Sequence, residues 1–572
     1  MNYFSGIAAS RGIAFGPIFH FRQSEVIITR NTVSDTQAEW ERFLEALGIA
    51  KVQLQAIYET AREELGEEQA AIFEAHQMVL DDPDLLDAVH RMVFEQCINC
   101  ESALSEASES FAKLLEALDD EYFRARAVDV RDVAGRLVRI LMGKSESPTK
   151  NLKQPSIIVA YDLMPSDTAQ LDKSLVLGFC TSVGGATSHS AILARSLALP
   201  AVVGAGNCLM DILEGKPAIL DGNLGTLIID PDETTIDNCL QQQSEQRNSK
   251  AVAMVHAHQP ATTIDGFTVE VIANIGNLED ARGAVEAGAE GVGLFRTEFL
   301  YLEHSELPDE ETQYQAYKAI LEVFGTLPVI LRTLDIGGDK ELPYLKLPTE
   351  MNPFLGLRAI RLCFAHPELF KPQLRAALRA GVGHNLKIMF PMIATVGEVR
   401  QARRVFEECR QELKSEGIPT ADNIEIGIMV EIPAAAVQAD LLAQEVDFFS
   451  IGTNDLSQYT MAADRTNSTV ANLTSCFQPP VLRLVQQVIE AGHRSGKRVG
   501  MCGEMAGEPL AVPLLIGFGL DDFSMNPSAI PEAKQIIRSI RRDEAELLAR
   551  QALNETDPKD IQAMVSRFLS KL

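Results

Sequence analysis

Residues 447–455 read Asp-Phe-Phe-Ser-Ile-Gly-Thr-Asn-Asp, a short apolar run that passes directly into polar residues. The same pattern occurs on either side of this stretch: Glu431 follows the apolar run 427–430, and Cys502 follows the run 498–501. Short apolar runs bounded by glycine and polar residues are typical of buried strands. We therefore expect buried strands that carry polar side chains at their carboxyl ends.

Strand-like runs of this kind recur at regular intervals through the second half of the chain. Their centres are Val271, Val292, Ile330, Met389, Ile428, Phe449, Met501 and Phe523. Apolar residues with helical spacing lie between them, for example over 311–323, 396–412 and 481–491. A doubly wound sheet usually has fewer strands than the eight found here. We therefore assign residues 262–572 to a (β/α)8 TIM barrel.

The carboxyl ends of barrel strands form the catalytic face of this fold. Arg296 and Arg332 end two of the predicted strands, and Arg358 and Arg465 lie nearby in the sequence. The rigid donor forks of arginine suit phosphate and carboxylate oxygens. The pattern predicts a small, densely anionic substrate, a phosphate ester that also bears a carboxylate.

The same strand ends supply hard oxygen ligands. Glu431 and Asp455 offer two carboxylates, which are too few to enclose Ca²⁺ but suit Mg²⁺, because Mg²⁺ fills its remaining positions with substrate oxygens and water. Asn454 can donate a hydrogen bond to a phosphate oxygen, and Cys502 is a candidate acid or base for a carbon centre. We predict a Mg²⁺ ion beside the substrate.

A second candidate site lies in the stretch 184–189, Gly-Gly-Ala-Thr-Ser-His. The glycines allow a tight turn, Thr187 or Ser188 can cap a helix, and an apolar helical face follows His189. The free N–H groups and positive dipole end of a helix stabilise a phosphate. We therefore predict that His189 is a nucleophile that carries a phosphoryl group.

The surrounding sequence predicts an α/β unit interrupted by helices. Strand-like runs occupy 156–160, 175–179, 200–203 and 218–220. We assign residues 1–25 and 148–231 to this α/β unit, and residues 26–147 to a helical bundle of two hairpins, because glycine and proline nearly vanish there. The polar stretch 232–261 predicts a linker or a single connecting helix.

Charge and composition exclude several classes of protein. Lys and Arg total 51 and Asp and Glu total 80, so the net charge of −29 repels nucleic acid and anionic membranes. The first part of the helical region, residues 31–90, is especially acidic, which indicates either a solvated face or a docking surface for a basic partner. No run reaches the roughly 18 apolar residues of a membrane span. Residues 1–21 lack the basic region, apolar region and small-residue cleavage site that together predict a signal peptide. We expect a cytosolic, cytoplasmic enzyme.

The nine cysteines do not form a disulfide pattern. Cys97 and Cys100 have the spacing of redox and zinc sites, but no second pair accompanies them. We interpret them as ordinary cysteines of a helical stretch.

In this order, the motifs resemble those of the phosphoenolpyruvate–protein phosphotransferases, the Enzyme I family of the bacterial sugar phosphotransferase system. The resemblance covers essentially the whole chain. The matching segments are Gly184–His189 for the phosphohistidine motif, Asp447–Tyr459 and Gly500–Glu504 for the barrel signatures, and Asp119–Tyr122 with Ala127–Asp132 for the helical signature. Ala186 departs from the family pattern, because many relatives have arginine there.

The resemblance implies a reaction and a role for each residue. His189 accepts the phosphoryl group of phosphoenolpyruvate and passes it to a histidine of the carrier protein HPr, while Cys502 protonates the enolate to give pyruvate. Glu431 and Asp455 bind Mg²⁺. The expected substrate-binding residues are Arg296, Arg332, Arg358, Asn454, Asp455 and Arg465. The family further implies a homodimer through the barrel, a helical subdomain that receives HPr, and an α/β domain that swivels.

Two alternative functions compete with this hypothesis. A pyruvate-phosphate dikinase shares the histidine and the barrel, but it needs an ATP-binding domain, and residues 26–147 contain no P-loop. A non-catalytic phosphoenolpyruvate sensor predicts loss of His189 or Cys502, and both are present.

Overall fold

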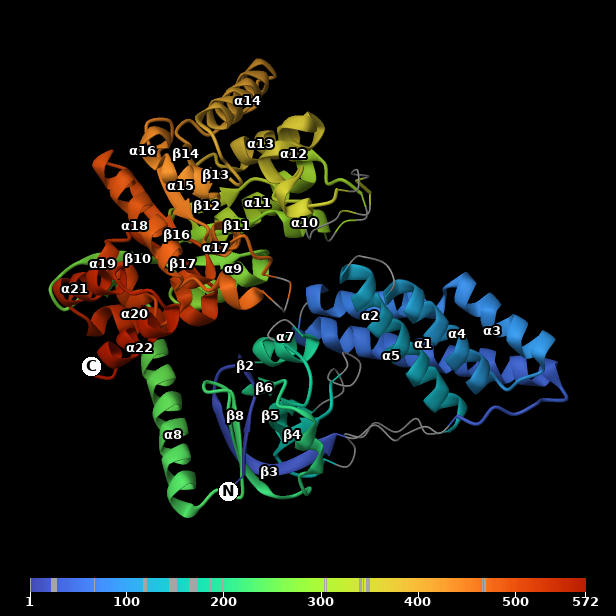
Figure 1. Cartoon of the computed structure of the whole chain (residues 1–572). Coiled ribbons are helices and arrows are strands. Elements are labelled where there is room, and N and C mark those ends of the chain that lie inside the picture. Colours follow the sequence, from blue (N-terminus) through green and yellow to red (C-terminus); the bar gives the residue numbers. More distant parts are fainter. Residues whose placement is uncertain are drawn as a thin grey trace. The chain divides into compact units, whose positions relative to one another are not determined.

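The computed structural model divides into two compact units, Met1–Gln246 and Arg247–Leu572, which are described separately (Figure 1). It describes the chain apart from residues 1, 22–27, 66, 117–120, 144–151, 164–171, 186–187, 198, 303, 305, 339–341, 343, 346–349, 466, 468–469 and 572. Ala186 and part of the predicted helical signature therefore lie outside the described residues. Among the described helices, none is both long and apolar enough to cross a membrane.

The first unit contains a mixed sheet in the order β1-β8-β7-β3-β4-β5-β6-β2. Strands β3 to β6 pair in parallel, and the remaining pairs are antiparallel. The strands are β1 (Asn2–Ser5), β2 (Ile7–Ser10), β3 (Ile13–Phe21), β4 (Ser156–Ala160), β5 (Val176–Thr181), β6 (Ala201–Val203), β7 (Pro217–Asp221) and β8 (Thr226–Ile229). Apolar side chains are buried on both sheet faces, because β4 contributes Ile158 to one core and Ile157 to the other.

A helical bundle is inserted between β3 and β4, which are parallel neighbours with Ile18 opposite Ile157. Its helices are α1 (Thr36–Leu65), α2 (Glu67–Leu80), α3 (Pro83–Gln96), α4 (Cys100–Glu116) and α5 (Glu121–Leu141). Helix α1 packs against α2, and α4 packs against α5, around a core that includes Phe43, Leu54 and Leu104. The predicted insertion of a helical bundle into an α/β domain is confirmed.

The cysteine pair spans the junction of two helices of the predicted helical stretch: Cys97 caps the end of α3, and Cys100 is the first residue of α4. Cys97 adopts a left-handed backbone at the end of α3. The buried Cys100 begins α4, where its N–H donates to Glu39 Oε1 at 2.8 Å. Both cysteines are free thiols.

The second unit is the predicted (β/α)8 barrel (Figure 1). The parallel strands run in chain order from β10 to β17, and β17 pairs with β10 to close the barrel. They are β10 (Thr268–Ile275), β11 (Val292–Arg296), β12 (Val329–Arg332), β13 (Leu386–Phe390), β14 (Glu425–Val430), β15 (Phe448–Ile451), β16 (Arg498–Met501) and β17 (Asp522–Met525). A short β9 (Ala261–Thr262) pairs antiparallel with β10.

Helices surround these strands and bury their apolar faces against them. The helices are α9 (Leu278–Glu286), α10 (Glu298–Leu302), α11 (Glu310–Phe324), α12 (Ala359–Ala365), α13 (Pro367–Ala380), α14 (Val396–Ser415), α15 (Pro433–Val437), α16 (Ala439–Leu442), α17 (Thr453–Met461), α18 (Pro479–Arg494), α19 (Val512–Phe518), α20 (Ile530–Ser539), α21 (Arg542–Ala552) and α22 (Pro558–Leu569). Local sequence signals set helix starts: Thr395 and Glu398 form a reciprocal capping box at α14.

Helix α8 (Glu233–Val255) occupies most of the stretch predicted as a linker or single helix. The boundary between the two units, at Gln246 and Arg247, falls within it. The five domain ranges assigned from the sequence remain predictions.

Candidate active site

The site is built at the carboxyl ends of the barrel strands. Arg296 and Arg332 are the last residues of β11 and β12, and they are register partners across the two strands. Glu431 directly follows β14, and Cys502 directly follows β16. The parallel register therefore places these residues at one end of the barrel.

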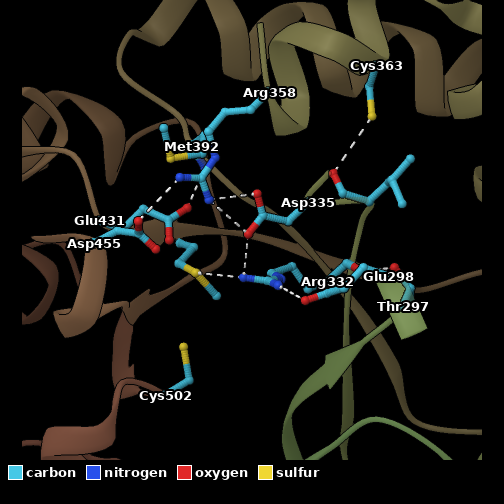
Figure 2. A network of polar contacts seen from close by, with 12 residues as sticks. Thr297, Glu298, Arg332, Asp335, Arg358, Cys363, Met392, Glu431, Asp455 and Cys502 are labelled. Carbon is cyan, nitrogen blue, oxygen red and sulfur yellow. Dashed lines mark hydrogen bonds and ion pairs between the residues drawn. The ribbon is translucent and has the colours of Figure 1, made fainter. Parts of the chain in front are cut away.

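Arg332 is buried and held by carboxylates on two sides (Figure 2). Its guanidinium lies 2.5 Å from Glu298 Oε1 and 3.0 Å from Asp335 Oδ2. It also contacts the sulfur of Met429 at 3.7 Å. Burial disfavours the charge, but the two carboxylates outweigh it and raise the pKa of Arg332. The fork is therefore charged and fixed in direction.

Arg358 repeats this arrangement on the other side of Asp335. Its guanidinium lies 3.1 Å from Asp335 Oδ1 and 3.3 Å from Asp455 Oδ1, and it donates to the Tyr459 hydroxyl at 3.2 Å. Asp335 thus bridges two buried arginines (Figure 2). The buried charges compensate one another in a continuous ion-pair network.

Glu431 is more deeply buried than Asp455, the other predicted metal ligand. Its Oε1 accepts a hydrogen bond from the Met392 N–H at 2.6 Å. Burial, together with repulsion from Asp455 and Asp335, raises the pKa of Glu431. A divalent cation bound by Glu431 and Asp455 would offset this repulsion. The donor set therefore fits a divalent metal.

The protein alone does not complete the coordination shell of such a metal. Within the described part of the chain, no group of three or more His, Cys, Asp or Glu side chains is arranged to hold an ion. Mg²⁺ is commonly bound by one or two carboxylates, with substrate oxygens and water in the other positions. Glu431 and Asp455 match that pattern.

Strained backbone positions cluster around the same loops. Ala359, directly after Arg358, has φ +51°; Met392, which donates to Glu431, has φ +54°; and Ala462, which ends α17, has φ +50°. Left-handed backbone is unfavourable for residues other than glycine, and such strain persists where the surrounding structure enforces it. The folded barrel therefore imposes the geometry of these loops.

Cys502 lies among apolar side chains, and its sulfur is directed towards the ion-pair network (Figure 2). Its buried neighbours are Leu294, Ile330, Met389, Met429 and Phe448. Burial raises the pKa of Cys502 to about 11, although the Ser450 hydroxyl and Arg332 oppose this effect. The thiol therefore stays protonated at neutral pH and can serve as an acid.

The remaining predicted residues lie on α17 and just beyond it. Asn454 Oδ1 accepts a hydrogen bond from the Glu504 N–H at 3.1 Å, which joins α17 to the loop after Cys502. The Arg465 N–H donates to Gln458 Oε1 at 3.1 Å. The ion pairs found around Arg332 and Arg358 do not include the Arg465 side chain among the described contacts.

In the first unit, α7 (His189–Ser196) begins at His189, as the sequence predicts for the start of the helix. Gly184 has φ +106°, so the tight turn before the helix needs a glycine. Ser188 directs its hydroxyl to the Gly185 carbonyl oxygen at 2.8 Å. Thr187, the other cap candidate, lies outside the described residues.

Sequence reasoning did not assign roles to Glu298, Asp335 or Met392. Glu298 and Asp335 each lie a few residues after a strand-end arginine, and a buried arginine requires a compensating carboxylate. That requirement is the signal that could have identified them. The Met392 backbone donor carries no sequence signal.

A (β/α)8 barrel with buried arginines and carboxylates at its strand ends is an arrangement suited to binding a small anionic substrate. Three family descriptions match: "PEP-utilising enzyme, PEP-binding domain" over residues 250–542, "PEP-utilising enzyme, N-terminal" over 5–126, and "PEP-utilising enzyme, mobile domain" over 152–225. The chain therefore belongs to the PEP-utilising enzymes.

Curated relatives show to which family of PEP-utilising enzymes the chain belongs. Phosphoenolpyruvate-protein phosphotransferases from Geobacillus stearothermophilus and Bacillus sp. (strain S) are 49% and 48% identical to this chain, each match covering 99% of this chain and 98% of the relative. The enzyme of that name from Bacillus subtilis (strain 168) is 47% identical, with 99% of both chains covered. The chain is a member of the phosphoenolpyruvate–protein phosphotransferase family, which confirms the resemblance found in the motifs.

Proposed function

We propose that this enzyme transfers the phosphoryl group of phosphoenolpyruvate to His189 and then to a histidine of the carrier protein HPr, releasing pyruvate. The observation that carries the proposal is the buried network of Arg332, Arg358, Glu431 and Asp455, in a chain that aligns over almost its full length with phosphoenolpyruvate–protein phosphotransferases. The protein is an enzyme of this family. The roles of individual residues are part of the proposal.

Substrate binding falls to the arginines of the barrel. Arg296, Arg332 and Arg358 neutralise the phosphate and carboxylate of phosphoenolpyruvate. Asp335 already orients the forks of Arg332 and Arg358 before the substrate arrives. Asn454 and Arg465 add donors from α17 and from the loop after it. The net charge of −29 repels the substrate, so this local positive charge is needed for binding.

Enzymes of this family use a divalent metal, and we assign Mg²⁺ to Glu431 and Asp455. When bound, Mg²⁺ would neutralise charge that develops on the phosphoryl oxygens. Removal of divalent metal with a chelator should stop phosphorylation of the enzyme by phosphoenolpyruvate. Transfer from the phosphorylated enzyme to HPr should continue, because that step does not use the barrel. A metal requirement in the second step contradicts the assignment.

The chemical step uses His189 and Cys502 in sequence. The bond between phosphorus and the enol oxygen breaks as a phosphorus–nitrogen bond forms on the His189 imidazole, and the electron pair remains with the enolate. The S–H bond of Cys502 then breaks as a C–H bond forms at the terminal enolate carbon. The thiolate regains its proton from solvent.

Two partners complete the proposal. The acidic helical bundle suits HPr as a basic partner, because complementary charge steers association. A homodimer through the barrel follows from the family resemblance. The proposal also places the enzyme in the cytoplasm. The dikinase-like alternative is less favoured, because the full-length relatives carry the phosphotransferase name.

Isotope labelling tests the central step. The full-length enzyme is incubated with Mg²⁺ and phosphoenolpyruvate labelled at phosphorus, and the labelled residue is mapped. We expect label on His189 and none in the His189→Ala variant. His256→Ala is a matched control, because this exposed histidine lies in another segment, and it should label normally. Label on another residue overturns the proposal.

A further inference from the structure

The backbone of Cys502 is held by hydrogen bonds from two sides. Its N–H donates to the Ile451 carbonyl oxygen of β15 at 3.0 Å. Its carbonyl oxygen accepts a hydrogen bond from Asn274 Nδ2 at 2.9 Å. Asn274 Oδ1 in turn accepts a hydrogen bond from Ser524 Oγ at 2.6 Å. A chain of hydrogen bonds therefore runs from Ser524 through Asn274 to Cys502.

This chain crosses the strands at which the barrel closes. Asn274 lies near the carboxyl end of β10, Ser524 lies in β17, and Cys502 follows β16. Strand β17 pairs with both β10 and β16. Asn274 therefore connects the first strand of the barrel directly to the loop after the seventh, without relying on backbone pairing between them.

The space around Ser524 is filled closely. Ser524 is only 2% exposed. Gly293 of β11 faces it, and a Cβ atom at Gly293 would lie 2.5 Å from Ser524 Oγ. Any side chain at position 293 would displace the hydroxyl that orients Asn274. Glycine at position 293, on strand β11, therefore leaves the space that the Ser524 hydroxyl needs.

We propose that Asn274, oriented by Ser524, is a positioning residue that fixes the backbone of Cys502 and thereby aims its thiol at the reacting carbon of phosphoenolpyruvate. This inference rests on the acid role of Cys502 proposed above. The N–H and the carbonyl of Cys502 are both held, and its thiol donates a hydrogen bond to the Ile451 carbonyl oxygen at 3.8 Å, so the backbone contacts fix the point from which the thiol projects. A displacement of about 1 Å in a reacting group can cost about 10²-fold in rate.

Substitution of Asn274 tests the proposal in the full-length enzyme. Asn274→Ala should lower kcat for pyruvate formation by about 10²-fold. Phosphoenolpyruvate affinity, measured by titration calorimetry in a His189→Ala background, should stay unchanged. Ser524→Ala should give a smaller loss, because Asn274 keeps its bond to Cys502. Asn385→Ala is the control: this exposed residue precedes β13 at the opposite end of the barrel, and its variant should keep full activity.

The Asn274→Asp variant tests the proposal even if Asn274→Ala does not fold. It keeps the shape of the side chain and the acceptor for Ser524, but it removes the donor to the Cys502 carbonyl. It should therefore reproduce the loss in kcat, and circular dichroism checks that the variant is folded. Full activity in Asn274→Asp or in a folded Asn274→Ala overturns the proposal.

A double-mutant cycle with Cys502→Ala separates positioning from a general structural effect. If Asn274 acts through the thiol, Asn274→Ala has no further effect on kcat once the thiol is gone. If the two losses multiply, Asn274 acts independently and the proposal is wrong. If Cys502→Ala alone leaves kcat unchanged, the acid role of Cys502 fails, and this inference fails with it. A kcat lowered by Cys502→Ala but not by Asn274→Ala rejects this inference alone.

Discussion

Asp335 shows how a single residue can organise the site. Its carboxylate lies 3.0 Å from the guanidinium of Arg332 and 3.1 Å from that of Arg358, and all three side chains are buried. Removing one partner of a buried ion pair leaves an uncompensated charge, which costs more than the intact pair contributes. The orientation of both arginines therefore depends on Asp335.

We expect Asp335→Ala to lower the free energy of unfolding of the barrel by about 3–5 kcal/mol. Urea denaturation followed by circular dichroism measures the change. Asp543→Ala is a matched control, because it removes the exposed partner of Arg541, and an exposed pair contributes little. Equal midpoints for Asp335→Ala and the wild-type protein would mean that Asp335 does not compensate the buried arginines.

The raised pKa of Cys502 gives a second prediction at this scale. An ordinary thiol, with a pKa of about 8.5, loses its proton between about pH 7.5 and about pH 9.5. Burial raises the pKa of Cys502 to about 11, so the acid form persists through that range and is lost only as the pH rises towards 11. The rate of pyruvate formation in a single turnover should therefore show no thiol ionisation below about pH 9. A decline with an ordinary thiol pKa that disappears in Cys502→Ala would contradict this.

The sequence predicts several residues of the candidate active site, but it does not predict the contacts between them. Arg332, Glu431 and Cys502 could be identified because each directly ends or follows an apolar strand. The contact between Asp335 and Arg358 could not be predicted, because those residues are separated in the sequence and meet only when the loop after β12 folds. The roles assigned to the site residues remain predictions.

At the scale of elements, the strands of the barrel were predictable, whereas strand β8 of the first sheet was not. Barrel strands are buried on both faces and therefore read as continuous apolar runs. Strand β8 is short, follows a turn that contains Gly225, and pairs antiparallel with β1 and β7. So short a run carries a weak signal, and no strand was predicted there.

Asp522, which begins β17, gives an element-scale prediction of pH dependence. Burial raises its pKa to about 6, although Arg498 of the neighbouring strand opposes the effect. The folded barrel thus binds this proton more tightly than the unfolded chain does. The stability that it contributes is present below the ordinary pKa of 3.8 and is lost as the pH rises to about 6. Asp522→Asn should flatten this decline in urea midpoints, and an unchanged slope would contradict the assignment.

At the scale of the whole molecule, the proposed nucleophile and the proposed substrate site belong to different compact units. His189 lies in the unit Met1–Gln246, whereas Arg332 and Cys502 lie in Arg247–Leu572. The first unit retains its own packing up to α8, where Ile236 and Cys239 pack with Ile13 and Ile219. Compact units with their own cores usually fold alone. The two steps of the proposed mechanism can therefore be tested separately, in fragments that end and begin at this boundary.

The fragment 1–246 should fold and exchange a phosphoryl group reversibly with phosphorylated HPr, because it contains His189 and the helical bundle. The same fragment should be inert towards phosphoenolpyruvate, because the arginines, the carboxylates and Cys502 are absent from it. The fragment 247–572 should bind phosphoenolpyruvate with Mg²⁺ and transfer nothing. Phosphate exchange followed by mass spectrometry, with circular dichroism as the check on folding, measures each outcome. If a folded 1–246 fragment took its phosphoryl group directly from phosphoenolpyruvate, the division between nucleophile and substrate site would be wrong. If it failed to exchange with HPr, the helical bundle would lose its assignment as the carrier-docking domain.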